Sequence, residues 1–267
     1  MALILGPAEK LVSADKARWL IYGDNGVGKS TLLATVEGKG LVVSAQGENI
    51  KPYRGHPNIT VAQVSAWDDI VGLYTQLQKR GSTPGFDWIG FDTLTRLLGF
   101  GLEKVTGVVR TPEQMLAYFK NPPKSARGYD AWNDVGFLGR EMVDLYQQLP
   151  LHVIWLCQEE TVQPKFENDI LRTIPLLAGN VAWKGVKDIL EICGRLYVEG
   201  SEYADGVGNA RDIDPHFEEV RRLLIGKHPR YFTKGPTHVL GYTVEAPTWK
   251  NLAPSIGAEA FSANGEG

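Results

Sequence analysis

A short segment near the start of the chain has the composition of a phosphate-binding loop. It reads Gly23-Asp24-Asn25-Gly26-Val27-Gly28-Lys29-Ser30, which is the pattern Gly-x-x-x-x-Gly-Lys-Ser. Glycines let backbone N–H groups wrap around phosphate oxygens, because no side chain blocks the closest approach. The ammonium group of Lys29 would face the β- and γ-phosphates, and the hydroxyl of Ser30 would coordinate Mg²⁺. The segment therefore predicts a site for ATP and magnesium.

The residues around this loop supply the context that it requires. An apolar stretch at residues 17–22 leads into the glycines and predicts a strand, and residues 31–36 predict the helix that follows. Thr31, the first residue after the motif, completes the set of predicted nucleotide contacts. A loop placed between a strand and a helix argues against an accidental glycine-rich turn.

A second magnesium-binding residue is predicted at Asp92. It ends the apolar run Trp88-Ile89-Gly90-Phe91-Asp92, which is typical of a buried parallel strand. A carboxylate at such a strand end can hold Mg²⁺ through a water molecule. The alternative is that Asp92 caps the helix expected over residues 93–105.

Strands and helices alternate along the rest of the chain. Further strands are predicted at residues 41–45, 151–157, 193–198, 218–225 and 238–244, and further helices at 65–81, 138–149 and 179–190. The alternation predicts an α/β fold with a doubly wound, mostly parallel sheet. Residues 107–129, rich in proline and basic side chains, are interpreted as an insertion. A single ATPase domain is expected over residues 1–245, followed by a flexible tail at 246–267.

The overall composition argues against a disulfide scaffold and a membrane protein. Of the 267 residues 43% are hydrophobic, and Cys157 and Cys193 lie in apolar runs that suit buried thiols in a reducing compartment. No stretch is long and apolar enough to cross a bilayer, so we expect a cytoplasmic protein with no membrane partner. A net charge of −3 provides no general attraction to nucleic acid, so contact with DNA would depend on a local segment.

These motifs resemble those of the RecA-like P-loop ATPases. Asp92 is followed by Thr93 rather than by the glutamate of AAA+ ATPases, and neither Asn-Lys-x-Asp nor Leu-Ser-Gly-Gly-Gln occurs. More narrowly, residues 15–240 look like short phage-encoded proteins described as AAA-domain or nucleotide-binding proteins, some of which are single-strand annealing recombinases. The resemblance implies an oligomeric ATPase of DNA recombination or annealing, with modest Mg-dependent hydrolysis that DNA stimulates, located in the host cytoplasm if phage-encoded.

The resemblance also implies catalytic roles outside the loop. The general base of RecA-like proteins follows the strand at 41–45, where this chain has Gln46 and, two positions later, Glu48. A glutamine cannot accept the proton of the attacking water, so hydrolysis would use Glu48 or be slow, and Glu48 could equally be a solvated loop acid. Gln158 falls at the place of the γ-phosphate sensor, or is a strand-end residue bonded to backbone. Lys234 is the candidate for reaching a neighbouring subunit's nucleotide, although surface lysines are common.

Two segments occupy the places of the DNA-contacting loops of RecA-like recombinases. The candidate DNA-binding residues are Arg110, Lys120, Lys124 and Arg127 in the first segment, and Lys165 and Arg172 in the second, at 161–173. Cations bind phosphates and interleaved aromatic rings stack on bases, but Tyr118 and Phe119 could instead anchor the first segment to the core. A ring or filament would multiply weak contacts. The expected partners are single-stranded DNA, further copies of the chain and a single-strand DNA-binding protein.

The alternative function is a nucleotide-gated assembly or regulatory module with little turnover. Gln46 favours it, because an amide at the position of the general base cannot activate water. Under this alternative, ATP binding would order a protein interface and hydrolysis would be incidental.

Overall fold

The computed structural model describes residues 16–80, 85–107, 128–162, 171–177, 186, 188, 190–199, 220–235 and 241–255. These ranges contain nine strands, namely β1 (Arg18–Gly23), β2 (Gly40–Ala45), β3 (Ile59–Val64), β4 (Trp88–Asp92), β5 (His152–Val162), β6 (Arg172–Pro175), β7 (Ile192–Val198), β8 (Arg221–Leu224) and β9 (Thr243–Glu245). The helices are α1 (Lys29–Leu33), the 3₁₀ helix η2 (Lys51–Tyr53), α2 (Trp67–Lys79), α3 (Leu94–Thr106), α5 (Gly128–Gln147) and α7 (Trp249–Ser255).

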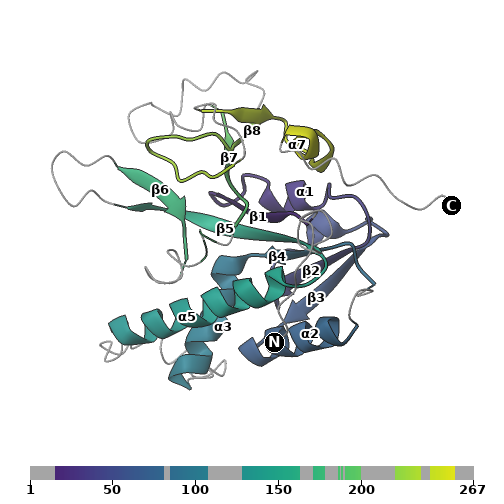
Figure 1. Cartoon of the computed structure of the whole chain (residues 1–267), viewed down its shortest axis with the longest axis vertical. Helices are drawn as coiled ribbons and strands as arrows, with labels where there is room; N and C mark the ends of the chain where they lie inside the picture. Colours follow the sequence, from purple (N-terminus) through teal and green to yellow (C-terminus); the bar gives the residue numbers. More distant parts are fainter. Residues whose placement is uncertain are drawn as a thin grey trace, which may run out of the picture.

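The strands form a mostly parallel sheet, which confirms the predicted fold class (Figure 1). Their order is β3-β2-β4-β5-β1-β7-β8-β9, and β6 pairs with β5 outside this path. The first five strands and β7 pair in parallel, whereas β6, β8 and β9 pair antiparallel to their neighbours. Parallel strands bring their carboxyl ends to one edge of a sheet, where open α/β folds bind ligands.

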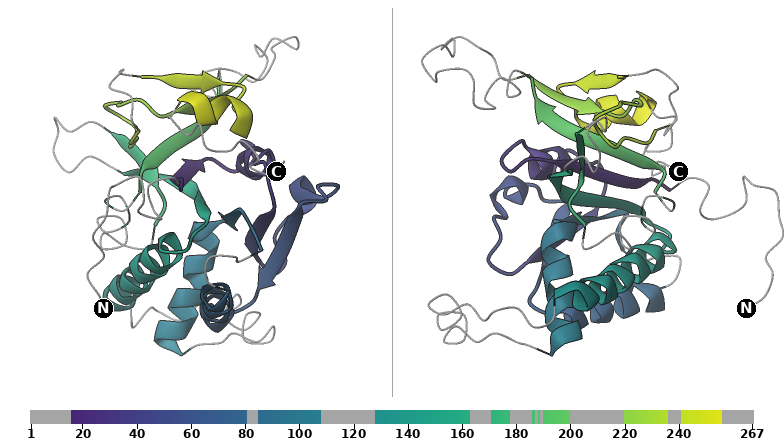
Figure 2. Two further views of the ribbon diagram at one scale, coloured as in Figure 1. Left: turned by 45° about the vertical axis from the view of Figure 1, so that its right-hand side comes forward. Right: turned by 90° about the vertical axis from the view of Figure 1, so that its left-hand side faces the viewer.

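Helices cover both faces of the sheet, so the sheet is doubly wound as predicted. In Figure 2, α2, α3 and α5 lie together on one side of the strands, whereas α7 lies with β8 and β9 away from them. Side chains of β1 alternate between two cores, as a strand buried on both faces requires. Leu20 and Tyr22 pack in the core beneath α2, α3 and α5, and Trp19 and Ile21 pack in the core with α1 and α7.

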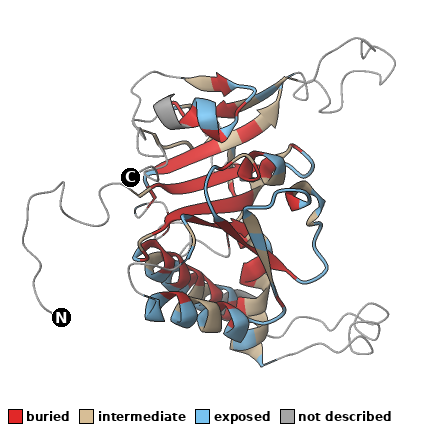
Figure 3. Ribbon diagram, turned by 90° about the vertical axis from the view of Figure 1, so that its right-hand side faces the viewer, coloured by how far each residue is buried: buried red, intermediate tan, exposed pale blue. Residues whose placement is uncertain are grey.

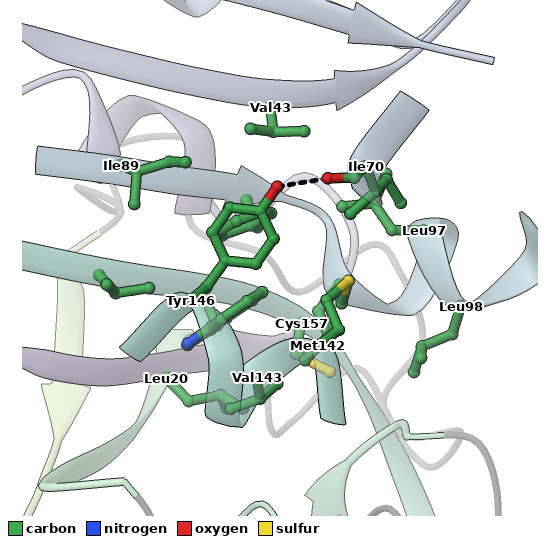
Figure 4. Close-up of a cluster of buried hydrophobic side chains, with 14 of the residues drawn as sticks. Leu20, Val43, Ile70, Ile89, Leu97, Leu98, Met142, Val143, Tyr146 and Cys157 are labelled. Atoms are coloured by element: carbon green, nitrogen blue, oxygen red, sulfur yellow. Dashed lines mark hydrogen bonds between the residues drawn. The ribbon is translucent and has the colours of Figure 1, made fainter. Parts of the chain in front are cut away.

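Aromatic side chains fill the larger core. The Phe91 and Trp155 rings stack with centroids 4.0 Å apart, and Tyr146 of α5 meets Phe91 edge-on at 4.8 Å. The Tyr146 hydroxyl donates a hydrogen bond of 2.7 Å to the carbonyl oxygen of Ile70, which ties α5 to α2 (Figure 4). Burial is concentrated on the central strands and on the sheet-facing sides of the helices (Figure 3).

Three of these elements, besides η2, were not predicted from the sequence. β3 was missed because only Val64 among its residues is buried, so its apolar pattern is weak. β6 begins at Arg172, inside the 161–173 segment expected to be a loop, and pairs antiparallel with β5. α7 lies in the tail that was expected to be flexible, and its Trp249 and Leu252 are buried. The described chain thus continues in a helix beyond residue 245.

Other boundaries shift by smaller amounts. α5 begins at Gly128, ten residues before the predicted start, inside the segment interpreted as an insertion; residues 108–127 of that segment lie outside the described residues. The helix predicted at 179–190 also falls mostly outside them.

Cys157 and Cys193 are buried free thiols, as predicted, and burial raises the pKa of Cys157 to about 12. In the described part of the chain, no helix has the length and apolar character to cross a membrane.

Candidate nucleotide-binding site

The glycine loop joins β1 to α1 and lies at the carboxyl edge of the sheet. Gly23 ends β1, and Gly28 caps the amino end of α1 with a φ of +100°, in the left-handed region where a side chain is strained. A Cβ atom at Gly23 would lie 2.2 Å from the carbonyl oxygen of Leu196, so this position must also lack a side chain. Asp24 and Asn25 are exposed, and Val27 is buried beneath the loop. The loop thus has a fixed base and a solvent-facing rim.

Lys29 is buried and directed back into the loop. Its Nζ atom donates to the carbonyl oxygens of Gly23 at 2.8 Å and Asp24 at 2.7 Å, and its side chain is 7% exposed. Burial lowers the pKa of Lys29, an effect opposed by neighbouring acids that include Asp92. The ammonium group is therefore positioned on the loop by the loop's own backbone.

Ser30, Asp92 and Tyr53 meet beside the start of α1. The Ser30 hydroxyl donates to Oδ2 of Asp92 at 2.7 Å, although the two residues are 62 positions apart and β5 lies between β1 and β4. The Tyr53 hydroxyl donates to the same oxygen at 2.6 Å. Burial, and then the charge of Asp92, raise the pKa of Tyr53 well above its usual value, so its proton is retained. Thr93, and not Asp92, caps the amino end of α3. Its hydroxyl accepts a hydrogen bond from the backbone N–H of Arg96.

The cluster of Ser30 and Asp92 has the chemistry of a magnesium site. A serine hydroxyl can donate its proton to the carboxylate while its oxygen lone pairs face a metal ion. Hydroxyl and carboxylate oxygens are hard ligands, which Mg²⁺ prefers, and Mg²⁺ usually takes its remaining ligands from phosphates and water. The residues present therefore fit a magnesium ion bound together with a nucleotide.

Gln158 lies beside the loop at the end of the buried part of β5. Its backbone is level with Gly23 in the β1–β5 pair, and its Nε2 atom donates to Oδ1 of Asn25 at 3.2 Å. Its backbone N–H donates to the hydroxyl of Thr95 at 3.0 Å. The amide of Gln158 thus contacts the loop through Asn25, and the position predicted as a sensor is adjacent to the phosphate-binding loop.

Glu48 and Lys234 contact residues outside the glycine loop. Glu48 is exposed and forms a 3.5 Å ion pair with Arg96 at the start of α3. The backbone of Lys234 pairs with that of Cys193, and its Nζ lies 3.5 Å from the carbonyl oxygen of Asp188. Whether Lys234 reaches a neighbouring subunit stays a prediction.

The DNA-binding candidates lie almost entirely outside the described residues. Those outside are Arg110, Lys120, Lys124, Arg127 and Lys165. Arg172 is described: it is exposed at the start of β6, opposite Val162 of β5. It therefore projects from a hairpin rather than from a loop.

Sequence reasoning missed Tyr53 and Thr95. Tyr53 comes from η2, which follows β2 and packs against α1, and no motif marks it. Thr95 is the third residue after Asp92, and its hydroxyl lies within 3.0 Å of both the Gln158 nitrogen and the Leu176 carbonyl oxygen. Their roles follow only from their positions in the folded structure, where Tyr53 lies beside Asp92 and Thr95 lies beside Gln158.

A cavity of about 460 Å³ adjoins the loop on the side of β8 and β9. Thr31 and Gly28 form one wall, and residues 245–248 form another. Arg221 also lines the cavity. Its side chain lies against the loop, since a Cβ atom at Gly28 would lie 2.9 Å from its Nε atom. The volume is in the range of sites for small ligands.

Comparisons with known proteins identify one matching family and two similar solved structures. The sequence matches a family model described as "AAA domain" over residues 15–237. No curated protein matches it. Among solved structures, the chain is similar to a DnaB-like replicative helicase, with 12% identity and a TM-score of 0.45 over 86% of this chain and 56% of that chain. The chain thus spans little more than half of the helicase. It is also similar to the RadB recombinase, with 11% identity and a TM-score of 0.42 over 89% and 90% of the two chains.

Proposed function

Since the chain belongs to the AAA domain family, we propose that it binds ATP with Mg²⁺ and hydrolyses it. The observation that carries the proposal is the 2.7 Å contact between Ser30 and Asp92 beside the glycine loop. A hydroxyl at the start of α1 and a carboxylate from β4 form the pair that a magnesium–nucleotide complex needs. A glycine-rich turn with no nucleotide to bind would not require this contact.

Each residue of the site has a distinct task in the proposed reaction. Loop N–H groups hold phosphate oxygens, and Lys29 exchanges its backbone partners for phosphate. Ser30 and Asp92 would hold Mg²⁺, and the ion would supply positive charge to balance the negative charge of the phosphates. Gln158, already in contact with Asn25, is suited to sense whether a γ-phosphate is bound, because an amide can both donate and accept hydrogen bonds.

The nucleoside would lie in the cavity beside α1. Thr31 lines that cavity and immediately follows Ser30, so a ligand with its phosphates in the loop extends naturally into it. Arg221 offers a planar cation on which a base can stack, and residues 245–248 close the far side. The cavity therefore accounts for the part of ATP that the loop does not contact.

Nucleotide binding is tested by comparing Lys29→Ala with Lys79→Ala. Lys79 is an exposed lysine at the end of α2, so its removal controls for a general loss of positive charge. We expect Lys29→Ala to weaken MgATP binding about 100-fold, equivalent to roughly 3 kcal/mol, in isothermal titration calorimetry. Equal affinities for the two variants would refute the assignment of the loop.

An assembly module with little turnover is the second candidate function. Gln46 and the exposed, Arg96-paired position of Glu48 favour this candidate. Phosphate release by Glu48→Gln distinguishes the two functions. A large loss of turnover supports the ATPase, whereas unchanged slow turnover together with loss of assembly in Lys29→Ala supports the module.

We also propose that single-stranded DNA is a partner and that the active form is a ring or filament acting in recombination or strand annealing. The support is the sequence resemblance and the cations of residues 107–129 and 161–173. Replacing Arg110, Lys120, Lys124 and Arg127 by Ala should weaken oligonucleotide binding and reduce its salt dependence, by about one unit of slope for each phosphate that is no longer neutralised. Fluorescence anisotropy and light scattering with and without nucleotide measure binding and assembly. An unchanged salt slope would remove this segment from the interface.

The proposal that a single-strand DNA-binding protein is a further partner rests on the same sequence resemblance. Its test is co-sedimentation of the two proteins with and without an oligonucleotide. Binding only in the presence of the oligonucleotide would show that DNA, and not a protein contact, joins them.

A further inference from the structure

Tyr53 connects the segment after β2 to the carboxylate of Asp92. Its hydroxyl donates to Asp92 Oδ2 at 2.6 Å, and the Ser30 hydroxyl donates to the same oxygen at 2.7 Å. The three residues come from three elements, η2, β4 and α1. One carboxylate oxygen thus accepts two hydrogen bonds. One comes from Ser30, which precedes β2 in the sequence, and the other from Tyr53, which follows β2.

The contact is more specific than the burial of a phenol requires. A buried tyrosine needs a hydrogen-bond acceptor, and backbone carbonyl groups usually serve. The hydroxyl groups of Tyr22 and Tyr146 both donate to backbone carbonyl oxygens in this way. Tyr53, which is 4% exposed, donates instead to a charged side chain that is itself 8% exposed. Hydrogen bonds to charged groups are shorter and stronger than those between neutral groups.

Two donors on Oδ2 fix the rotation of the Asp92 carboxyl group. A terminal carboxyl torsion is otherwise broad and has no strongly preferred angle. With Oδ2 held by Ser30 and Tyr53, Oδ1 is the oxygen available to a water molecule of a bound magnesium ion. If the Tyr53 hydroxyl is removed, Ser30 alone cannot prevent the carboxyl group from turning.

We propose that Tyr53 is a positioning residue for magnesium, which orients Asp92 through the hydrogen bond between its hydroxyl and Oδ2. The inference rests on the proposed binding of a magnesium nucleotide at this site. Tyr53 would act on the metal through Asp92. Removing partners that orient metal ligands usually weakens metal binding by 10- to 100-fold.

The experiment separates magnesium coupling from nucleotide binding as such. A fluorescent ADP analogue is titrated with protein in EDTA, and Mg²⁺ is then titrated at fixed analogue and protein concentrations. Tyr53→Phe keeps the ring that packs in the core and removes only the hydroxyl. We expect it to raise the midpoint of the Mg²⁺ titration about tenfold or more and to leave affinity in EDTA unchanged.

Tyr146→Phe is the matched control. Tyr146 is as deeply buried as Tyr53 and also loses a single hydrogen bond, but that bond goes to Ile70 between α5 and α2. This control should leave the Mg²⁺ midpoint unchanged, even if both variants lower the unfolding temperature. Equal effects of the two variants would mean that Tyr53 contributes only packing, and would overturn the proposal.

A double-mutant cycle with Asp92→Asn tests the route through Asp92. Once Asp92 has lost its charge, removing the Tyr53 hydroxyl should have no further effect on the Mg²⁺ midpoint. Additive effects in the double variant would overturn the proposal. If the wild-type protein binds the analogue and its affinity rises with Mg²⁺ but Tyr53→Phe behaves identically, only the role of Tyr53 fails. If the wild-type protein binds no nucleotide, the proposed function fails as well.

Discussion

The side-chain hydroxyl of Thr95 accepts a hydrogen bond of 3.0 Å from the backbone N–H of Gln158. The same hydroxyl donates to the carbonyl oxygen of Leu176, also at 3.0 Å. Thr95 belongs to α3, which begins just after Asp92, whereas Gln158 marks the point where β5 passes the loop and Leu176 follows β6. One hydroxyl therefore holds together α3, the predicted sensor Gln158 and the hairpin of β5 and β6.

Replacing Thr95 by Val should destabilise the protein and disturb the site. Valine keeps the shape of the side chain but leaves the Gln158 N–H without its acceptor, which costs about 1–3 kcal/mol. We expect a matching fall in the free energy of unfolding measured with urea, and a lower rate of ATP hydrolysis. Thr95→Ser retains the hydroxyl and should recover most of both losses. A Val variant as stable as the Ser variant would show that the hydroxyl has no structural role.

Trp249→Ala should destabilise the whole domain rather than only the chain end. The Trp249 ring is 2% exposed and lies with its centroid 4.5 Å from that of Trp19 in β1. Truncating a buried tryptophan typically costs about 3–5 kcal/mol through lost burial and the cavity left behind. Thermal unfolding followed by circular dichroism would measure the effect. The neighbouring Lys250→Ala, at an exposed position, should change the melting temperature little; similar behaviour of both variants would indicate that α7 is not part of the folded unit.

Stability should fall as the pH drops below about 6.5 because of His152. Its Nδ1 atom accepts the backbone N–H of Ala17 at 2.9 Å, and burial, followed by the charges of Lys16 and Arg18, lowers its pKa to about 3. Above the ordinary pKa of 6.5 the imidazole is neutral in both states, so it adds no pH dependence. Between pH 6.5 and 3 the unfolded chain binds a proton that the folded protein excludes, which removes up to about 1.4 kcal/mol per pH unit.

Urea unfolding at pH 7.5 and pH 5 tests this sign. His152→Gln should be less stable than the wild type at pH 7.5, and the difference between the two should shrink at pH 5. Carboxylates contribute to the remaining pH dependence in both proteins, so the comparison isolates His152. A constant difference at the two pH values would contradict the lowered pKa.

Arg221→Ala should weaken nucleotide binding through the nucleoside and not through the phosphates. Stacking of a base on a guanidinium group contributes about 1 kcal/mol, so ADP affinity should fall roughly fivefold. Pyrophosphate, which has no base, should bind the variant and the wild type equally in calorimetry. Arg140→Ala, on the exposed face of α5, controls for the change in net charge. A parallel loss of pyrophosphate affinity would place Arg221 at the phosphates instead.

The sequence alone determined the features that depend on neighbouring residues. The loop at residues 23–30 has a fixed spacing of glycines, lysine and serine, and the apolar runs of β1, β2, β4 and the buried part of β5 are continuous because both faces of these strands are covered. These signals are local, so they predicted the phosphate-binding loop and the α/β class. β3 and β6, which are more exposed, lack that signal and were missed.

The tertiary structure decided which distant side chains complete the site. Ser30, Tyr53 and Asp92 meet at one carboxylate oxygen because α1, η2 and β4 converge at the carboxyl edge of the sheet. Thr95 reaches Gln158, and Trp249 returns to β1, for the same reason: strand order, and not sequence spacing, sets which side chains become neighbours. A hydrogen bond between residues that far apart in the chain leaves no periodic pattern in the sequence, so only the folded arrangement reveals it.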